Sequence, residues 1–185
     1  MQPPDLNHPD LYLNRELSLL EFNRRVLAQA NFDDVPLLER LRYMCISCTN
    51  LDEFFEVRVA AKFQQAAVSK ASLTADGMTP TDNLKAISAT AHELVADQYR
   101  MLNEVLIPAL EAEQIRFIRR TGFTAEQDKW VRQYFRDELL PILTPIGLDP
   151  AHPFPRIINK SLTFIVSLKG RDAFGRSGNM AVVQA

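Results

Sequence analysis

The sequence has few of the features that mark a secreted, membrane-bound or nucleic-acid-binding protein. Its 185 residues include only two cysteines, and 21 basic against 23 acidic side chains leave a net charge of -2. That balance offers no bulk attraction for nucleic acid or for an anionic bilayer. No apolar stretch approaches the ~20 residues of a membrane span, and the opening "MQPPDLNHPD" has no signal-peptide pattern. We therefore expect a cytoplasmic globular protein with no membrane span and no nucleic-acid partner.

A recognisable catalytic motif is also absent from the sequence. The phosphate-binding pattern G-x-x-x-x-G-K-[ST] does not occur, and His8, His92 and His152 lie far apart. Asp149 and His152 are close enough for an acid/base pair, although proline-rich corners commonly use such residues in turns. We expect no catalytic residue and no metal-binding residues in this chain.

The two cysteines, Cys45 and Cys48, form a C-x-x-C pair. The pair could be a redox couple or half of a metal site. No strand precedes it, however, and no second cysteine pair or H-x₃₋₅-H completes four zinc ligands. The periodic apolar run around the pair favours buried thiols on a helix.

The first helix is predicted from the stretch "LSLLEFNRRVLAQA". Ser18 and Glu21 have the spacing of a capping box, which predicts that the helix begins at Ser18. Arg24 and Arg25 fall outside its apolar face. Solvated side chains are the simplest interpretation of these two arginines, and a phosphate contact is the alternative.

The corner between the second and third helices contains Asn50. Pro36 suits the first turn of a helix that is predicted to stop near Thr49. Asn50 and Glu53 then repeat the capping spacing, so a third helix is predicted from there to about Ala67. Asn50 could cap that helix, or it could offer its amide to a ligand, and the two roles are compatible.

A loop is expected at 68–81, followed by a long helix with a heptad-like apolar seam. The seam consists of Leu84, Ile87, Ala91, Leu94, Gln98, Met101 and Val105, and only Gln98 interrupts its apolar character. It needs a helical partner, either in the same chain or in a second copy. Three heptads are short for a coiled coil, which favours packing inside the domain. Pro108 should kink or end the helix.

Strands are expected only in the last third of the chain. The first candidate is "IRFI" at 115–118. A hairpin with a long loop is predicted from the β-branched and aromatic stretches at 161–168 and 180–185. The second of these strands runs to the final residue, so we expect a truncated sheet with an open edge there.

Between these strands, a further helix and a proline-rich segment are predicted. Thr124 and Gln127 form another capping box, opening a helix through about Leu139. Its core side should contain Trp130, Val131, Phe135 and Leu139. Five prolines between 141 and 155 then predict an extended, irregular path.

Three long motifs resemble the N-terminal part of the classical bacterial polyphosphate kinase family. They are "YLNRELSLLEFNRRVLAQA", "PLLERLRYMCISCTNLDEFFEVRVA" and "LTPIGLDPAHPFPRIINKSLTFIVSL", in the order that this family shows. Two small departures are Leu19, where an aromatic side chain is usual, and the cysteine-rich "MCISC". Neither falls on a residue to which a function is assigned.

The resemblance implies a mostly α fold, with a helical N-terminal domain at 1–106 on the nucleotide-base side. The beginning of an α+β head domain used in dimerisation would follow at 107–185, truncated, and the two catalytic domains would be absent. The intact enzyme would transfer the terminal phosphate of ATP reversibly to polyphosphate through a phosphohistidine, with Mg²⁺. The 185 residues alone would then be inactive and would bind no cofactor by themselves.

For the site, the resemblance implies that Asn50 binds adenine, because the asparagine of "NLDEF" lines the nucleotide pocket in this family. ATP or ADP, polyphosphate and a second copy of the chain are the partners it implies. The alternative is a non-catalytic helical scaffold or dimerisation module, which the heptad seam favours. A helical nucleic-acid binder is disfavoured by the net charge.

Overall fold

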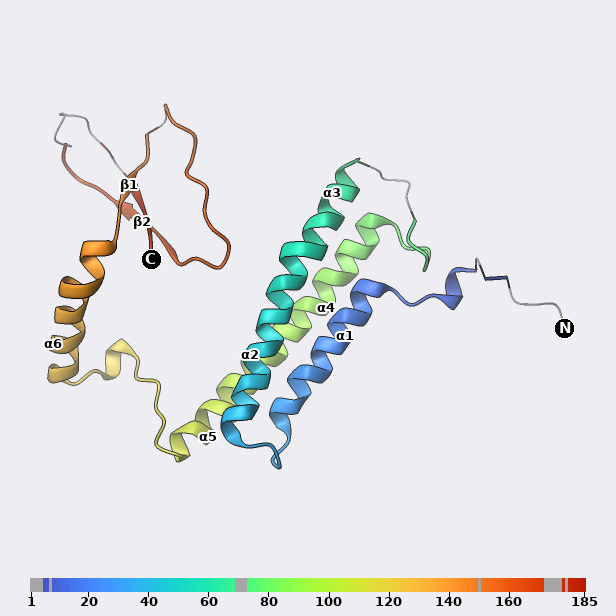
Figure 1. Cartoon of the computed structure of the whole chain (residues 1–185), viewed down its shortest axis with the longest axis horizontal. Coiled ribbons are helices and arrows are strands. Elements are labelled where there is room, and N and C mark those ends of the chain that lie inside the picture. The colour runs from blue at the N-terminus through green and yellow to red at the C-terminus, as the bar shows by residue number, and fades with distance from the viewer. Residues whose placement is uncertain (1–4, 7, 69–72, 150, 172–177, 179) are drawn as a thin grey trace. The chain divides into compact units, whose positions relative to one another are not determined.

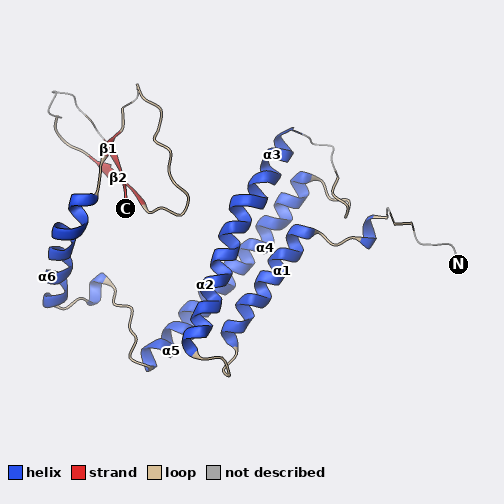
Figure 2. Ribbon diagram, in the orientation of Figure 1, coloured by secondary structure: helices blue, strands red, loops and turns tan. Residues whose placement is uncertain are grey.

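The computed structural model describes residues 5–6, 8–68, 73–149, 151–171, 178 and 180–185. They form two compact units, unit 1 up to Phe117 and unit 2 from Ile118, and each is described by itself. This division falls later in the chain than the boundary expected at 106/107. The reason is that Leu106 and Leu110 are both fully buried on one continuous helical rod. The mostly helical class with a small sheet is confirmed (Figure 2).

Unit 1 is a bundle of three helical rods that lie side by side (Figure 1). The first rod is α1 (Arg15–Ala28). The second joins α2 (Leu37–Glu53), a π-helical turn (Phe54–Val59) and α3 (Ala60–Val68). The third joins α4 (Pro80–Arg100), a π-helical turn (Met101–Leu106) and α5 (Ile107–Ala112). Short 3₁₀ turns occupy Pro9–Leu11 and Gln29–Asn31.

The seam of the long helix packs inside this bundle, as predicted. Ile87, Ala91 and Leu94 are buried against apolar side chains of α1 and α2. At its end the seam differs from the prediction, because Leu106 is fully buried while Val105 is only half-buried. The wider π-helical turn shifts the buried position by one residue. The seam is therefore covered within the chain and does not need a second copy.

Helix α1 begins earlier than predicted, and Ser18 does not cap it. Asn14 is the N-cap, and its side-chain oxygen accepts a hydrogen bond from the backbone N–H of Leu17 at 3.0 Å. The Asn14 amide also donates to Asp76 Oδ2 at 2.9 Å. Asparagine caps as well as serine does, and this second bond ties Asn14 to the loop before α4. A capping-box pattern covers only neighbouring residues, so it could not predict the contact between Asn14 and Asp76.

The Asn14–Asp76 contact should make the stability of unit 1 depend on pH. Burial opposes ionisation of Asp76, but hydrogen bonds from Thr74 and Asn14 outweigh it and hold its pKa below the ordinary 3.8. A lowered pKa stabilises the fold above the unfolded-state pKa, and this contribution is lost as pH falls through the folded-state value. We expect Asp76→Ala to destabilise by about 0.5–1.5 kcal/mol at pH 7, and by less near pH 3, which lies below the ordinary pKa of 3.8.

Urea unfolding at the two pH values measures this difference. Asp34→Ala, which changes an exposed aspartate of the same unit, is the matched control and should show no such pH-dependent gap. An equal loss of stability at both pH values in Asp76→Ala would contradict an ionic role for this carboxylate.

Unit 2 begins with a helix whose capping box is confirmed. Thr124 and Gln127 exchange side-chain and backbone hydrogen bonds at the start of α6 (Ala125–Tyr134). A π-helical turn (Phe135–Leu139) and a 3₁₀ turn (Leu140–Ile142) follow, and a 3₁₀ turn at Arg120–Gly122 precedes the helix.

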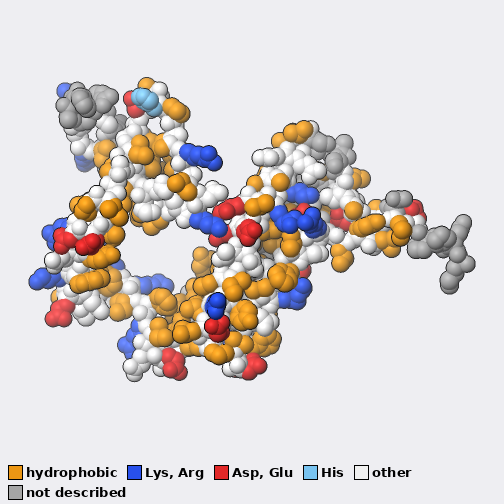
Figure 3. Space-filling model, viewed as in Figure 1, with side chains coloured by type: hydrophobic (Ala, Val, Ile, Leu, Met, Phe, Trp, Pro, Cys, Tyr) orange, Lys and Arg blue, Asp and Glu red, His pale blue; other side chains and the backbone are white. Residues whose placement is uncertain are grey.

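The predicted core side of this helix is wrong. Trp130 and Phe135 are 64% and 44% exposed, and Val131 and Leu139 are also exposed. Figure 3 shows apolar side chains at the surface of this region. Periodicity identifies the apolar face of a helix but not what covers it. No described element of unit 2 buries this face.

The C-terminal sheet has three strands in the order β1-β3-β2 (β1, Ile146–Gly147; β2, Thr163–Ser167; β3, Met180–Gln184). The predicted hairpin of β2 and β3 is confirmed, with Ile165 opposite Val182. The expected open edge on the last strand is wrong, because β3 is the middle strand and pairs with β1 on its other side. The predicted strand at 115–118 is also wrong, since those residues belong to none of the three strands of the described sheet.

Candidate functional site

Asn50 lies inside a helix, and the predicted helix corner at this residue does not exist. Helix α2 runs on to Glu53, and the Asn50 carbonyl accepts the backbone N–H of Phe54. The side chain therefore does not cap a helix. The Asn50–Glu53 spacing matches the capping pattern, but the apolar residues on both sides keep one rod continuous across it. The Asn50 amide therefore has a different role from capping.

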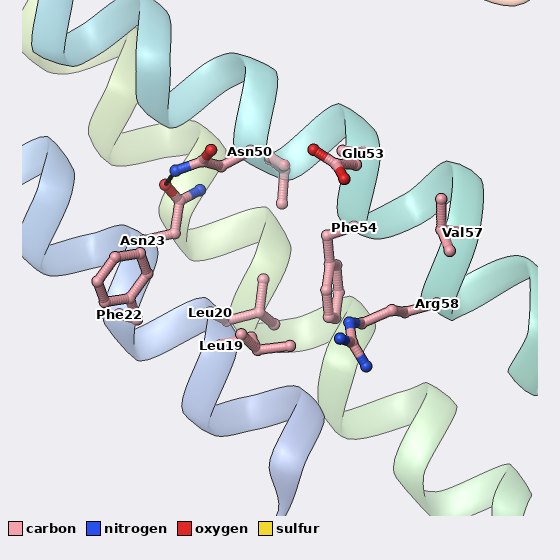
Figure 4. A pocket seen from close by; sticks show the side chains of 10 residues that line it. Leu19, Leu20, Phe22, Asn23, Asn50, Glu53, Phe54, Val57 and Arg58 are labelled. Atoms are coloured by element: carbon pink, nitrogen blue, oxygen red, sulfur yellow. Dashed lines mark hydrogen bonds between the residues drawn. The ribbon is translucent and has the colours of Figure 1, made fainter.

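Two asparagine amides meet where α1 faces α2. Asn23 is 4% exposed, and its Nδ2 donates to the backbone carbonyl of Ser47 at 2.9 Å. Asn50 is half-buried, and its Nδ2 donates to Asn23 Oδ1 at 3.3 Å (Figure 4). Gln98 of α4 extends this network by donating to Ser47 Oγ at 2.9 Å. Polar side chains from all three rods thus meet at this point.

The Ser47 carbonyl determines how both amides are oriented. A carbonyl can only accept, so Asn23 must turn its NH₂ towards Ser47 and its oxygen towards Asn50. Asn50 must then donate, which leaves its own Oδ1 pointing away from Asn23 (Figure 4). Among the described residues no donor is found for this oxygen. An amide also has two N–H groups, so Asn50 can still both accept from a ligand and donate to it.

The two amides belong to a pocket of about 300 Å³ between α1 and the second rod (Figure 4). Its wall combines six apolar side chains with two amides and two charged groups. Its lining residues are Leu19, Leu20, Phe22, Asn23, Asn50, Leu51, Glu53, Phe54, Val57 and Arg58. An apolar hollow with a few fixed polar groups is the usual form of a small-molecule site.

The π-helical turn of the second rod places Arg58 at this pocket. Leu51 and Phe54 are buried three residues apart, and the next buried residue is Val59, five residues further on. A regular α-helix would bury the residue at position 58 instead. The wider turn puts Val59 in the core and Arg58 at the pocket wall. The sequence does not reveal this position of Arg58, because Phe55 and Val59 have the ordinary four-residue helical spacing and only the structure shows Phe55 to be exposed.

The two arginines of α1 have structural partners. Arg24 Nη1 lies 2.8 Å from Asp97 Oδ2, and its Nε and Nη2 lie 3.4 Å from Glu21 Oε1 and Glu93 Oε2, so Arg24 ties α1 to α4. The Arg25 guanidinium carbon lies 5.8 Å from the centre of the Phe22 ring, a cation–π distance. The geometry gives Arg24 a bundle-stabilising role rather than a phosphate contact.

The other chemical candidates of the sequence do not form a site in the described part of the chain. Cys48 is half-buried on α2, but Cys45 is exposed, so the prediction of two buried thiols is wrong for Cys45. Burial, Cys45 and Asp52 raise the pKa of Cys48, which lowers its thiolate fraction. His152 Nδ1 lies 3.4 Å from Asp149 Oδ2 at the surface. Both residues belong to a turn in which Asp149 Oδ1 accepts a hydrogen bond from the backbone N–H of Ala151.

The described residues contain no group of three or more His, Cys, Asp or Glu side chains that could hold a metal ion. None of their helices combines the length and apolarity needed to cross a membrane.

Sequence comparison places the whole bundle in a known family. The model of the polyphosphate kinase N-terminal domain matches residues 12–118, and that of the polyphosphate kinase middle domain matches 126–185. This chain belongs to the polyphosphate kinase family. The junction of the two matches agrees with the division between units 1 and 2.

Individual family members agree with this assignment. The polyphosphate kinase of Pseudomonas syringae pv. tomato is 53% identical over 98% of this chain. That of Burkholderia cenocepacia is 57% identical over 94% of this chain. A polyphosphate kinase crystal structure from Porphyromonas gingivalis matches 93% of the chain with a TM-score of 0.72 and 27% identity. The chain spans 25% of the length of these two relatives and 24% of the crystallised chain.

Proposed function

We propose that this chain supplies the base-binding side of the nucleotide site in a polyphosphate kinase, an enzyme that transfers the terminal phosphate of ATP reversibly to polyphosphate. Membership of the family supports the activity. The observation that carries the assignment of the site is the oriented amide of Asn50 on the wall of an apolar pocket.

Adenine is the ligand that this pocket suits best. Its edge presents an amino donor beside a ring-nitrogen acceptor, which one asparagine amide can match with its oxygen and an N–H. The flat faces of the ring are apolar and would lie against Leu20 and Phe54, which are buried beside the pocket. Asn23 fixes the orientation of Asn50 in advance, so little side-chain ordering remains to be done on binding.

Phosphoryl transfer itself is assigned outside these residues. His8, His92 and His152 are exposed, and none of them lines the pocket, so none is proposed as the phosphohistidine. Magnesium enters the proposal as the cation that accompanies ATP, with no ligand assigned among the described residues. Polyphosphate binding and a cytoplasmic location complete the proposal.

Dimerisation is assigned to unit 2, because its apolar side chains are exposed while the seam of unit 1 is buried. The scaffold alternative relied on that seam as a contact between copies. Because the seam is covered inside the bundle, it no longer supports the alternative of a non-catalytic scaffold or dimerisation module.

Two substitutions of Asn50 in the full-length protein test the base site. Asn50→Ala removes one neutral hydrogen bond and should weaken ATP binding by about 0.5–1.5 kcal/mol, a factor of roughly 2 to 13. Asn50→Asp should weaken it further, since aspartate has no N–H to donate and brings a negative charge towards a polyanion. Isothermal titration with ATP measures both affinities.

Asn103 provides the matched control, because it is an exposed asparagine of the same unit whose amide donates to the Tyr99 carbonyl. Asn103→Asp should leave ATP affinity unchanged. Wild-type affinity in Asn50→Asp would remove the residue from the nucleotide site.

A further inference from the structure

Arg58 is an unusual cation in this fold. Four Lys or Arg side chains in the described residues are buried or half-buried: Arg24, Arg40, Lys62 and Arg58. The first three have ion-pair partners, Asp97, Asp33 and Glu16. Among the residues that the structure describes, Arg58 has no hydrogen-bond, ion-pair or ring contact. A partly desolvated charge without a partner is unfavourable, so a bound anion would satisfy it.

The guanidinium of Arg58 faces the same pocket as Asn50. Figure 4 shows it beside the Phe54 ring and directed towards α1, with the two amides at the other end of the pocket. Leu20 and Phe54 lie between these two ends. The pocket thus has a hydrogen-bonding end, an apolar middle and a cationic end. A ligand that fits all three has a polar edge, a flat apolar body and an anionic group.

The spacing along the rod suits one nucleotide. Residues 50 and 58 are separated by about 12 Å at 1.5 Å per helical residue. Helical side chains lean towards the N-terminus of their helix, which brings the guanidinium nearer to Asn50. A ribose and its first phosphate can bridge such a gap when the base lies at Asn50.

The negative charge of Glu53 favours one orientation of the nucleotide in the pocket over the reverse. Glu53 is one helical turn from Asn50 and lines the same pocket. Its carboxylate repels phosphate from the amide end, while Arg58 attracts phosphate to the other end. The neutral base is therefore favoured at Asn50 and the phosphate at Arg58.

We propose that Arg58 binds the first phosphate of the nucleotide whose base contacts Asn50. The inference rests on the proposed function, and it adds a second contact point and a direction to the base site. Guanidinium groups bind phosphate oxygens through paired N–H donors, and lysine supplies the charge without the planar fork.

The test compares adenosine, AMP and tripolyphosphate as competitors of a fluorescent ATP analogue in the full-length protein. In Arg58→Gln we expect AMP to bind about tenfold more weakly, the lower range for a charge-assisted hydrogen bond. Adenosine affinity should change by less than about twofold, because only the phosphate contact is lost. Arg58→Lys should recover part of the AMP affinity.

Arg42→Gln is the matched control, since Arg42 is an exposed arginine on the same rod, paired with Glu39. It should leave all three competitors unchanged. Unchanged adenosine affinity in Arg58→Gln also shows that the pocket is still folded.

Other results would overturn the inference. They are an unchanged AMP affinity in Arg58→Gln, an equal loss for adenosine and AMP, or a loss confined to tripolyphosphate, which would assign Arg58 to the polymer. If adenosine binding falls in Asn50→Asp while AMP is unaffected by Arg58→Gln, only the inference fails. If adenosine binding is insensitive to Asn50, the proposed base site fails and the inference fails with it.

Discussion

Replacement of Leu94 by alanine is expected to lower the free energy of unfolding of unit 1 by about 3–5 kcal/mol. Leu94 is fully buried in the middle of the seam, among side chains from the other two rods. Truncating a buried leucine loses its transfer free energy and leaves a cavity that the neighbours fill only in part. Since this is a large share of the usual 5–15 kcal/mol of a domain, Leu94→Ala should be among the most damaging single truncations here.

Chemical denaturation at several protein concentrations measures the loss of stability. The same experiment shows whether the seam packs inside one chain or between two copies. If the seam packs inside one chain, the loss is the same at every concentration; if it joined two copies, the midpoint would move with concentration. Leu84→Ala, at a half-buried position of the same helix, is the control and should cost clearly less. A concentration-dependent midpoint would return the seam to an interface between copies.

Much of the fold could be predicted from the sequence where local periodicity and burial agree. The seam through Ile87 and Leu94 and the capping box at Thr124 required only helical spacing. The β2–β3 hairpin required only two β-branched and aromatic stretches. In each case the residues that define the element are also the ones that stabilise it.

Two of the errors involve contacts between residues far apart in the chain. Asn14 replaces Ser18 as a cap while also bonding Asp76, and β3 becomes a middle strand because β1 pairs with it. No local pattern contains either contact. The exposed Trp130 shows the converse, a correctly identified apolar face with no covering element among the described residues.

The candidate site shows the same division. Asn50 was found through its motif, but its geometry depends on Asn23, which lies 27 residues away in sequence, and on the Ser47 carbonyl. Arg58 could not have been found in this way from the sequence, because Phe55 and Val59 are four residues apart and the apolar stripe looks regular there. Only the structure shows that Phe55 is exposed and that burial advances by five residues from Phe54 to Val59. A π-helical turn often occurs at a functional position, so this irregularity of the structure directs attention to Arg58.

Asn23→Asp is expected to be far more damaging than the same change at Asn50. At position 23 the new carboxylate would be 4% exposed and would place an oxygen against the Ser47 carbonyl, where an N–H now donates. An uncompensated buried charge costs about 3–5 kcal/mol. At Asn50 the side chain is half-buried, and the lost hydrogen bond is long at 3.3 Å, so a cost near 1 kcal/mol is expected.

Urea unfolding of the two variants at pH 7 measures this contrast, and repeating it at pH 4 identifies its cause. The folded-state pKa of the new carboxyl at position 23 should be raised by burial, so its destabilising effect should shrink as the group is protonated in acid. Asn23→Leu, which removes the amide without adding charge, should show no such recovery. Equal losses for Asn23→Asp and Asn50→Asp would mean that Asn23 is not the buried residue that orients the pocket amide.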